Sequence, residues 1–206
     1  LGAAGLMRGA SRIASAYCGF REAFGSRIGQ MQLVAESEQH IRRQSDLALA
    51  GAFETLDLWH RHVPNGRSLG DNASRVHVSI AKAVGTRVAQ AVAYEAMMLL
   101  AGNGIEEQFS ALPRLVRDAA IFETWEGPYT LLLMQALEDL VRFRVGGREE
   151  EIMAHLWPTG EIPGELTSTL RELLADPKSE KNVLRFRGFA HDYYSAYQGA
   201  ALSHYR

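Results

Sequence analysis

The chain has 206 residues, of which 47% are hydrophobic and 22% are charged, and its formal net charge is -2. This composition is typical of a globular protein with one large domain, or one domain and an extension. The small net charge argues against a general basic surface for nucleic acid, and no apolar run approaches the roughly 20 residues that span a bilayer.

The single cysteine, Cys18, excludes an internal disulfide framework. It indicates a reducing compartment, which we take as the cytoplasm, with the mitochondrial matrix left open. Without a paired-cysteine or Cys/His signature, Cys18 is interpreted as a small buried hydrophobe and not as a nucleophile. The first six residues lack a Met and the regions of a signal peptide, so we expect a piece of a longer protein.

Apolar residues at helical spacing predict long amphipathic helices in the first half of the chain. The expected helices cover residues 1–20, 28–63 and about 72–100. Phe24-Gly25-Ser26 is expected to stop one helix and restart the next. A loop is expected over 64–70, and the polar residues of 72–74 are candidate N-caps of the third helix.

Two more helices complete the expected bundle. Pro113 is expected to start a short helix that runs to Phe122, and Tyr129 to about Val145 is the fourth main helix, stopped by Gly146-Gly147. No alternating strand pattern competes in this region. The sequence therefore predicts an all-α fold, an antiparallel, up-and-down four-helix bundle over residues 1–146.

Residues 147–206 are predicted to form a helical extension packed on the bundle. Short helices are expected over 149–157 and 166–174, and a last helix over 178–205 with an aromatic face. Its basic stretch, from Lys178 to Arg187, is interpreted as a solvated helix face, with a phosphate- or DNA-contacting surface as the alternative. The seven histidines are scattered and show no metal-site spacing.

Trp125-Glu126-Gly127-Pro128 is the stretch most suggestive of a ligand-binding or catalytic site. Pro128 suits the first position of a helix, so Glu126 is expected at a helix N-terminus beside a large aromatic. That position suits a carboxylate held against a flat ligand. The alternative is an acidic residue that complements a helix dipole, and on the seven residues from Phe122 to Pro128 alone this alternative is the better interpretation.

Five segments, in one order and register, resemble the C-terminal domain of the acyl-CoA dehydrogenases. They are Arg21-Glu22-Ala23-Phe24-Gly25 with Gln32, Ser79-Ile80-Ala81-Lys82-Ala83, Ala101-Gly102-Asn103-Gly104, Pro113-Arg114-Leu115-Val116-Arg117-Asp118-Ala119, and Trp125-Glu126-Gly127-Pro128. Residues beyond about 145 lie outside the common family pattern. The sequence departs from that pattern at Pro128, where the family has Thr or Ser, at Met98, where some members have Gln, and at Ala101, where it has Gly.

The resemblance implies a role for each matching residue. Glu126 stands at the place of the catalytic base, which removes the α-proton of an acyl-CoA while FAD takes the β-hydrogen, and its backbone N–H is implied to bond the thioester carbonyl. Trp125 and Gly127 flank it on the substrate side. The positions implied to contact the FAD of a neighbouring subunit are Arg21, Phe24, Gln32 and Gly102. Arg117 and Asp118 are implied to form a structural ion pair.

The family also implies partners. These are an N-terminal helical domain and a middle β-domain ahead of this chain, a homodimer or homotetramer, an acyl-CoA substrate, and an electron acceptor such as an electron-transfer flavoprotein. The chain alone is then expected to be inactive. Three alternatives stay open: an AidB-like flavoprotein that contacts DNA, a helical interaction module without flavin, and a base on the first helix ahead of Leu1.

Overall fold

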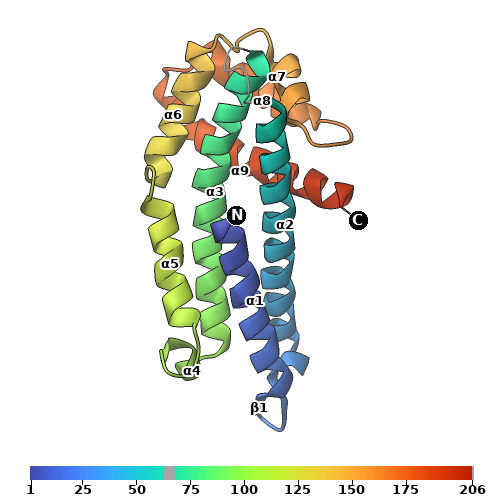
Figure 1. The fold of residues 1–206 in the computed structure, drawn as a ribbon, viewed down its shortest axis with the longest axis vertical. Coiled ribbons are helices and arrows are strands. Elements are labelled where there is room, and N and C mark those ends of the chain that lie inside the picture. Colours follow the sequence, from blue (N-terminus) through green and yellow to red (C-terminus); the bar gives the residue numbers. More distant parts are fainter. Residues whose placement is uncertain (63–67, 206) are drawn as a thin grey trace. The chain divides into compact units, whose positions relative to one another are not determined.

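The computed structural model describes residues 1–62 and 68–205, and most of this part of the chain is helical (Figure 1). The predicted all-α class is confirmed. The chain forms two compact units, one made of Leu1–Leu49 and Gly85–Glu126, the other of Ala50–Val84 and the chain from Gly127 onward. Two long helices contribute a part to each unit. The predicted domain boundary at Gly146-Gly147 stays a prediction.

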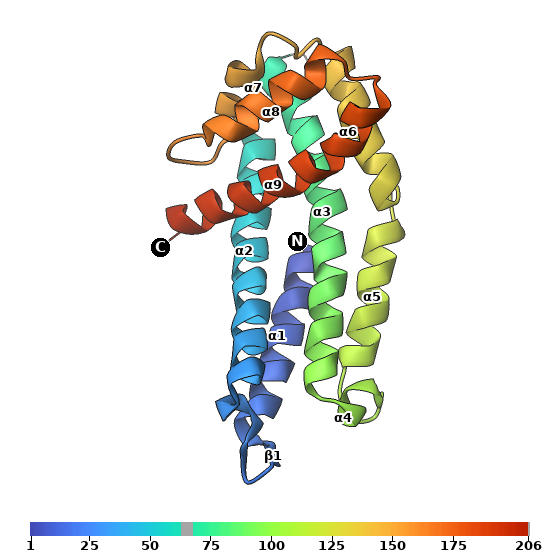
Figure 2. The ribbon, with the colours of Figure 1, turned by 180° about the vertical axis from the view of Figure 1, so that it is seen from behind.

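The first unit has the predicted up-and-down connectivity, in which successive helices run in opposite directions (Figures 1 and 2). Its complete elements are α1 (Gly2–Phe20), β1 (Glu22–Ala23), β2 (Ser26–Arg27), the 3-10 turn η1 (Ile28–Gln30), α4 (Gly102–Ile105) and α5 (Leu112–Thr124). The first part of α2 (Gln32–His62) and the last part of α3 (Leu69–Leu99) complete it.

Helices α1, α3 and α5 share an apolar core in the first unit. Leu6, Ala93 and Ala119 are buried at its centre. Three partly buried side chains of α5 pack around them: Leu115, Val116 and Phe122. Small residues at the centre let the helices approach closely, and each large apolar side chain buried contributes about 1.5–3 kcal/mol.

The connection between α1 and α2 differs from the prediction. Instead of a helix stop and restart, β1 and β2 form a short antiparallel hairpin in which Glu22 pairs with Arg27. Phe24 and Gly25 occupy its tip with φ of 52° and 84°, the left-handed pair of a type I′ turn. Because η1 follows the hairpin, α2 begins at Gln32 and not at residue 28.

Helix α3 begins earlier than predicted, because its N-cap is Ser68. The Ser68 hydroxyl accepts a hydrogen bond from the Asp71 amide, and the Asp71 carboxylate accepts one from the Ser68 amide, each at 3.1 Å. This reciprocal pair is a capping box, so the polar residues of 72–74 lie inside the helix. The predicted end of α2 at 63 and residues 64–67 of the predicted loop lie outside the described residues.

The second unit joins the remaining parts of α2 and α3 to the C-terminal helices. These are α6 (Tyr129–Arg142), α7 (Glu149–Leu156), α8 (Gly164–Ala175) and α9 (Glu180–His204). Helix α6 ends three residues short of the predicted 145, because Arg144 and Gly147 take positive φ values of 55° and 84°. Within this unit α9 runs across the upper parts of α2 and α3 (Figure 2).

The predicted aromatic face of α9 forms much of the core of this unit. All five of its rings are buried: Phe186, Phe189, Tyr193, Tyr194 and Tyr197. Polar contacts also join helices of this unit. Tyr129 of α6 forms a hydrogen bond with His191 of α9 at 2.8 Å, and Arg75 of α3 pairs with buried Asp139 of α6 at 2.9 Å. In the described residues, every helix is too short or too polar to cross a membrane.

Candidate functional site

The turn between α5 and α6 carries the predicted base. Helix α5 ends at its C-cap, Trp125, whose backbone N–H donates to the Ile121 carbonyl at 3.0 Å. Glu126 then takes a φ of 58° and Gly127 one of 114°. Pro128 is the N-cap of α6 and not its first residue, and the helix begins at Tyr129 as predicted. Glu126 therefore lies two residues ahead of the cap, in the turn itself.

The backbone of Glu126 is unusual for a residue that carries a side chain. A left-handed φ costs a residue with a Cβ about 1–2 kcal/mol, and such residues gather at functional sites. The dipole of α6 does not explain the carboxylate, because that effect fades outside the first turn of a helix. Glu126 is also exposed. Arg144, beyond the end of α6, has the same left-handed backbone, so the φ of Glu126 marks the turn without assigning it a role.

An uncovered apolar surface lies next to this carboxylate in sequence. The Trp125 side chain is 64% exposed and meets Phe122 edge-on, with ring centroids 6.5 Å apart. Ile121, four residues earlier on the same face of α5, is 43% exposed. A flat or apolar ligand laid on this face would exclude water from one side of the turn.

Two cations of α3 touch the flanks of the turn. In the second unit, the Lys82 ammonium donates to the Gly127 carbonyl at 2.7 Å. In the first unit, Arg87 pairs with Glu123 at 3.2 Å, near the end of α5. The sequence assigned no role to either cation. Lys82 lies in a family-like segment, but nothing in its spacing shows which backbone group it reaches.

The residues predicted to contact FAD gather at the other end of the first unit. Arg21 follows the last residue of α1 and is exposed, and Gln32, the first residue of α2, is exposed as well. Phe24 at the hairpin tip is 99% exposed. A guanidinium, an aromatic ring and an amide are thus all exposed on this connection between α1 and α2, and no part of this unit covers Phe24.

The Ala101–Ile105 turn lies at the same end (Figure 1). Ala101 takes φ 50° and ψ -132°, a conformation that suits the glycine of the family and strains an alanine. Gly102 is exposed, and a Cβ placed on it would meet nothing within 4 Å. Its backbone is accordingly open to a ligand. Asn103 donates to the Tyr17 hydroxyl of α1 at 3.1 Å and so holds the turn.

Gly104, to which the sequence assigned no separate role, is required for packing. A Cβ at this position would lie 2.0 Å from the Met97 carbonyl oxygen and 3.1 Å from the Leu100 Cβ. The turn folds back on the last turn of α3, so only a glycine fits. The two glycines of the motif therefore differ: Gly102 leaves a surface open, and Gly104 closes a backbone contact.

Replacing Gly104 by alanine is expected to lower the free energy of unfolding by about 2–4 kcal/mol, because backbone and not a flexible side chain must move. The melting temperature should fall by about 5–15 °C, measured by circular dichroism. The matched control is Gly102→Ala, which should change stability by less than about 1 kcal/mol. Equal stability of the two variants would contradict the close contact at Gly104.

The predicted site residues fall into two separate groups. The hairpin, the start of α2 and α4, which carry or adjoin Arg21, Phe24, Gln32 and Gly102, lie at one end of the first unit (Figures 1 and 2). Trp125 and Glu126 follow α5 at its far end. The 13 residues of α5 span about 20 Å. One copy of this unit does not bring the two groups to a common ligand atom.

The implied ion pair of Arg117 and Asp118 is wrong. Arg117 pairs instead with Glu107 at 2.7 Å, and Asp118 with Arg114 one turn earlier at 3.4 Å. On a helix, adjacent residues point in different directions, so consecutive side chains do not face each other. The contact of Arg117 still ties α5 to the loop before it, as a structural role requires.

The cysteine and the possible metal ligands of the chain show no sign of a reactive site in the described residues. Cys18 is fully buried. Desolvation and, to a lesser extent, the charge of Glu38 raise the pKa of its thiol. A raised thiol pKa suits a packing residue and not a nucleophile. Within residues 1–62 and 68–205, no group of His, Cys, Asp and Glu is arranged to hold a metal ion.

A buried histidine of the second unit, His77, has both ring nitrogens occupied. Thr55 Oγ1 donates to the Gly51 carbonyl at 2.7 Å, so at 2.9 Å it accepts the Nε2–H of His77. Nδ1 then accepts from the Tyr193 hydroxyl at 2.7 Å. Burial lowers the pKa of His77 to about 3. The ring is a neutral, structural hydrogen-bonding group.

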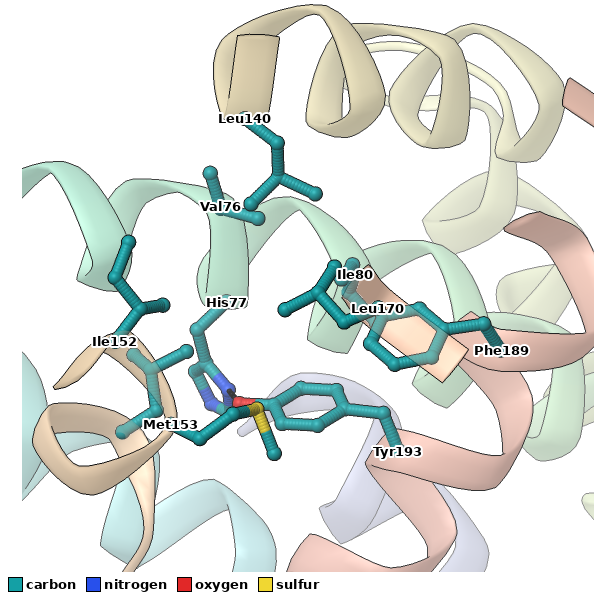
Figure 3. Close-up of a pocket in the computed structure, with 10 residues that line it drawn as sticks. Val76, His77, Ile80, Leu140, Ile152, Met153, Leu170, Phe189 and Tyr193 are labelled. Atoms are coloured by element: carbon teal, nitrogen blue, oxygen red, sulfur yellow. Dashed lines mark hydrogen bonds between the residues drawn. The ribbon is translucent and has the colours of Figure 1, made fainter. Parts of the chain in front are cut away.

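His77 and Tyr193 border a small cavity lined mostly by apolar side chains (Figure 3). Its volume is about 20 Å³, room for roughly one water molecule. The cavity is far too small for an acyl chain.

Comparisons with known proteins agree with the fold. No curated protein sequence matches the chain. A solved structure described as Bd2924 in its apo-form aligns over 98% of this chain and 39% of its own length, with 24% identity and a TM-score of 0.83. Caenorhabditis elegans ACDH-11, in complex with C11-CoA, aligns over 98% of this chain and 37% of its own, with 18% identity and a TM-score of 0.73.

The chain thus spans under two-fifths of the length of these two structures, whose identities establish the fold alone. The model of one protein family, the C-terminal domain of acyl-CoA dehydrogenases, matches residues 1–140. That range contains all five motifs and the turn that carries Glu126. Since the match covers most of the sequence, the chain belongs to the family of acyl-CoA dehydrogenase C-terminal domains.

Proposed function

We propose that this chain is the C-terminal helical part of an FAD-dependent acyl-CoA dehydrogenase, with Glu126 as its catalytic base. The observation that supports this most is the backbone of Glu126. A carboxylate is held at a φ of 58° beside a largely exposed tryptophan, in a member of this family. In this proposal residues 1–146 are the family bundle, and residues 147–206 are an extension that packs on it.

The residues at the hairpin end suit FAD chemically. An exposed guanidinium, Arg21, matches a pyrophosphate, and the uncovered ring of Phe24 matches an apolar ring face. The Gln32 amide offers polar contacts, and the open backbone at Gly102 permits close approach. Because this group lies about the length of α5 from Glu126, we propose that it serves the cofactor of a second copy.

In the proposed reaction Glu126 takes the α-proton of the acyl-CoA onto a carboxylate oxygen. A bound FAD would supply the acceptor for the β-hydrogen, which leaves as a hydride. The two C–H bonding pairs thus become one new C=C pair and the hydride, which leaves an α,β-unsaturated thioester. The Glu126 backbone N–H would donate to the thioester carbonyl, where negative charge builds up. Trp125 and Gly127 would exclude water on the substrate side.

The proposal includes the partners that complete such an enzyme. An acyl-CoA substrate follows from the family name and agrees with the C11-CoA bound to ACDH-11. We further propose N-terminal and middle domains that supply the rest of the pocket, a homodimer or homotetramer, and an acceptor such as an electron-transfer flavoprotein. The chain alone would be inactive, and the compartment would be reducing, such as the cytoplasm.

The DNA-binding alternative has no specific support. The net charge is -2, and one cation of the basic stretch, Arg185, is paired with Glu172 at 2.8 Å. Counterion release from DNA requires several cations free to contact phosphates. We therefore do not propose a nucleic-acid partner.

The proposal is tested on the longer protein that carries this chain. The coding sequence upstream of Leu1 should encode helices followed by a β-rich segment. The purified protein should contain FAD, and anaerobic addition of acyl-CoAs of short, medium, long and branched chains should bleach the oxidised flavin with at least one of them. A colourless protein that fails to take up FAD, or a flavin that no acyl-CoA reduces, would overturn the proposed function.

A further inference from the structure

We infer that Lys82 is a positioning residue for Glu126, through its hydrogen bond to the backbone of the next residue, Gly127. The inference rests on the proposed function, since it concerns the orientation of the proposed base. Lys82 would not touch substrate or cofactor. It would restrict the conformations open to the turn and so the direction of the carboxylate.

The turn needs such a restraint. Glu126 and Gly127 have consecutive positive φ values, 58° and 114°. For a glutamate the left-handed region is unfavourable, so an unrestrained chain would also populate extended conformations. Each of these would point the Cα–Cβ bond of Glu126 elsewhere. A proton transfer requires the acceptor oxygen within hydrogen-bond reach of the proton, so a wandering side chain would slow it.

The contact of Lys82 is strong and well placed. Its ammonium donates to the Gly127 carbonyl at 2.7 Å, and a hydrogen bond from a charged donor is roughly twice as strong as a neutral one. Pro128, which follows, has no N–H with which to anchor the same peptide group. Lys82 is half-buried within the long helix α3, which gives its side chain a rigid base.

Packing within each unit holds the two flanks of the turn. In the second unit, a Cβ on Gly127 would lie 3.3 Å from the Leu132 side chain, so the glycine sits tightly on α6. In the first unit, Arg87 pairs with Glu123, whose side chain is only 15% exposed, in the last turn of α5. Each of these contacts lies within its own unit, one at the end of α5 and one at the start of α6.

The test uses the FAD-loaded longer protein with Lys82→Met, which keeps the apolar stem and removes the ammonium. The rate of flavin reduction at saturating acyl-CoA is expected to fall about 10- to 100-fold, the cost of a misplaced reacting group. The dissociation constant of acyl-CoA should change less than about twofold. Lys82→Arg should recover part of the rate. The matched control is Lys181→Met, an exposed lysine of the same unit, which should keep the wild-type rate.

A second readout is independent of turnover. Amide hydrogen exchange in the peptide that covers residues 121–132 should be faster in Lys82→Met than in the wild type, with other helices unchanged. If Lys82→Met is insoluble, Lys82→Gln provides the same test, because the glutamine side chain is uncharged and one bond shorter than that of lysine. A wild-type reduction rate in these variants, or a slower rate with unchanged exchange in this peptide, would overturn the inference.

The outcomes separate this inference from the proposed function. If Glu126→Gln stops flavin reduction while Lys82→Met does not slow it, only the role of Lys82 fails. If no acyl-CoA reduces the wild-type flavin, the proposed function fails, and hydrogen exchange still shows whether Lys82 holds the turn.

Discussion

Replacing Glu126 by glutamine in the longer protein is expected to slow flavin reduction by acyl-CoA about 10²- to 10⁴-fold, the usual contribution of a general base. The amide has nearly the same shape as the carboxylate but cannot accept the α-proton. The backbone N–H proposed to bind the thioester carbonyl is unchanged, so acyl-CoA should still bind within a few-fold of the wild-type affinity. The measurement is anaerobic stopped-flow absorbance of the flavin.

Two comparisons make this result specific. Glu138→Gln removes another exposed carboxylate, on α6, and should leave the rate unchanged. Replacement of Glu126 by aspartate should give an intermediate rate, because the base is kept but its reach is shortened. A wild-type rate in Glu126→Gln would place the base elsewhere, as on the helix ahead of Leu1 that the resemblance left open.

The long helices were predictable because their apolar residues repeat with the period of a helix. The hairpin at Glu22–Arg27 was not, because strands of two residues are too short to show an alternating pattern. The start of α3 was missed for a related reason. Several polar residues near Ser68 could cap a helix, and the choice depends on a reciprocal hydrogen bond with Asp71 that composition does not reveal.

The candidate site was predictable as a motif but not as a geometry. The order of the family segments singled out Glu126, yet the sequence placed it at a helix start and gave no sign of its left-handed backbone. Lys82 is far from Gly127 in the chain, and Arg87 is far from Glu123. Such partners depend on how helices pack, which the spacing of residues along one helix does not determine.

The second unit contains a group whose charge should control stability in acid. His77 has a pKa of about 3 in the folded chain, lowered by desolvation, against an ordinary value of 6.5. The described groups that bond its ring nitrogens are neutral hydroxyls. Thr55 and Tyr193 bond its nitrogens, and burial raises the pKa values of Tyr193, Tyr194 and Tyr197, so these phenols stay neutral.

The folded state therefore favours neutral His77, while the unfolded chain takes up a proton as the pH falls below 6.5. Stability is fully present above that pH and is lost progressively down to about pH 3, with a slope of about 1.4 kcal/mol per pH unit and a total of about 5 kcal/mol. Above about pH 5 most carboxylates remain charged, so the window between pH 6.5 and 5, in which this ring contributes a loss of about 2 kcal/mol, is the best place to measure its effect.

Urea unfolding of the 206-residue chain, followed by circular dichroism between about pH 7 and pH 5, measures this slope. His77→Gln cannot be protonated, so its stability should fall less steeply with acid by up to about 1.4 kcal/mol per pH unit. Tyr193→Phe is the matched control: it removes the hydroxyl bonded to Nδ1 and should cost about 1–3 kcal/mol at neutral pH, while the histidine and its slope remain. Equal slopes in the wild type and His77→Gln would show that the buried ring does not govern acid unfolding.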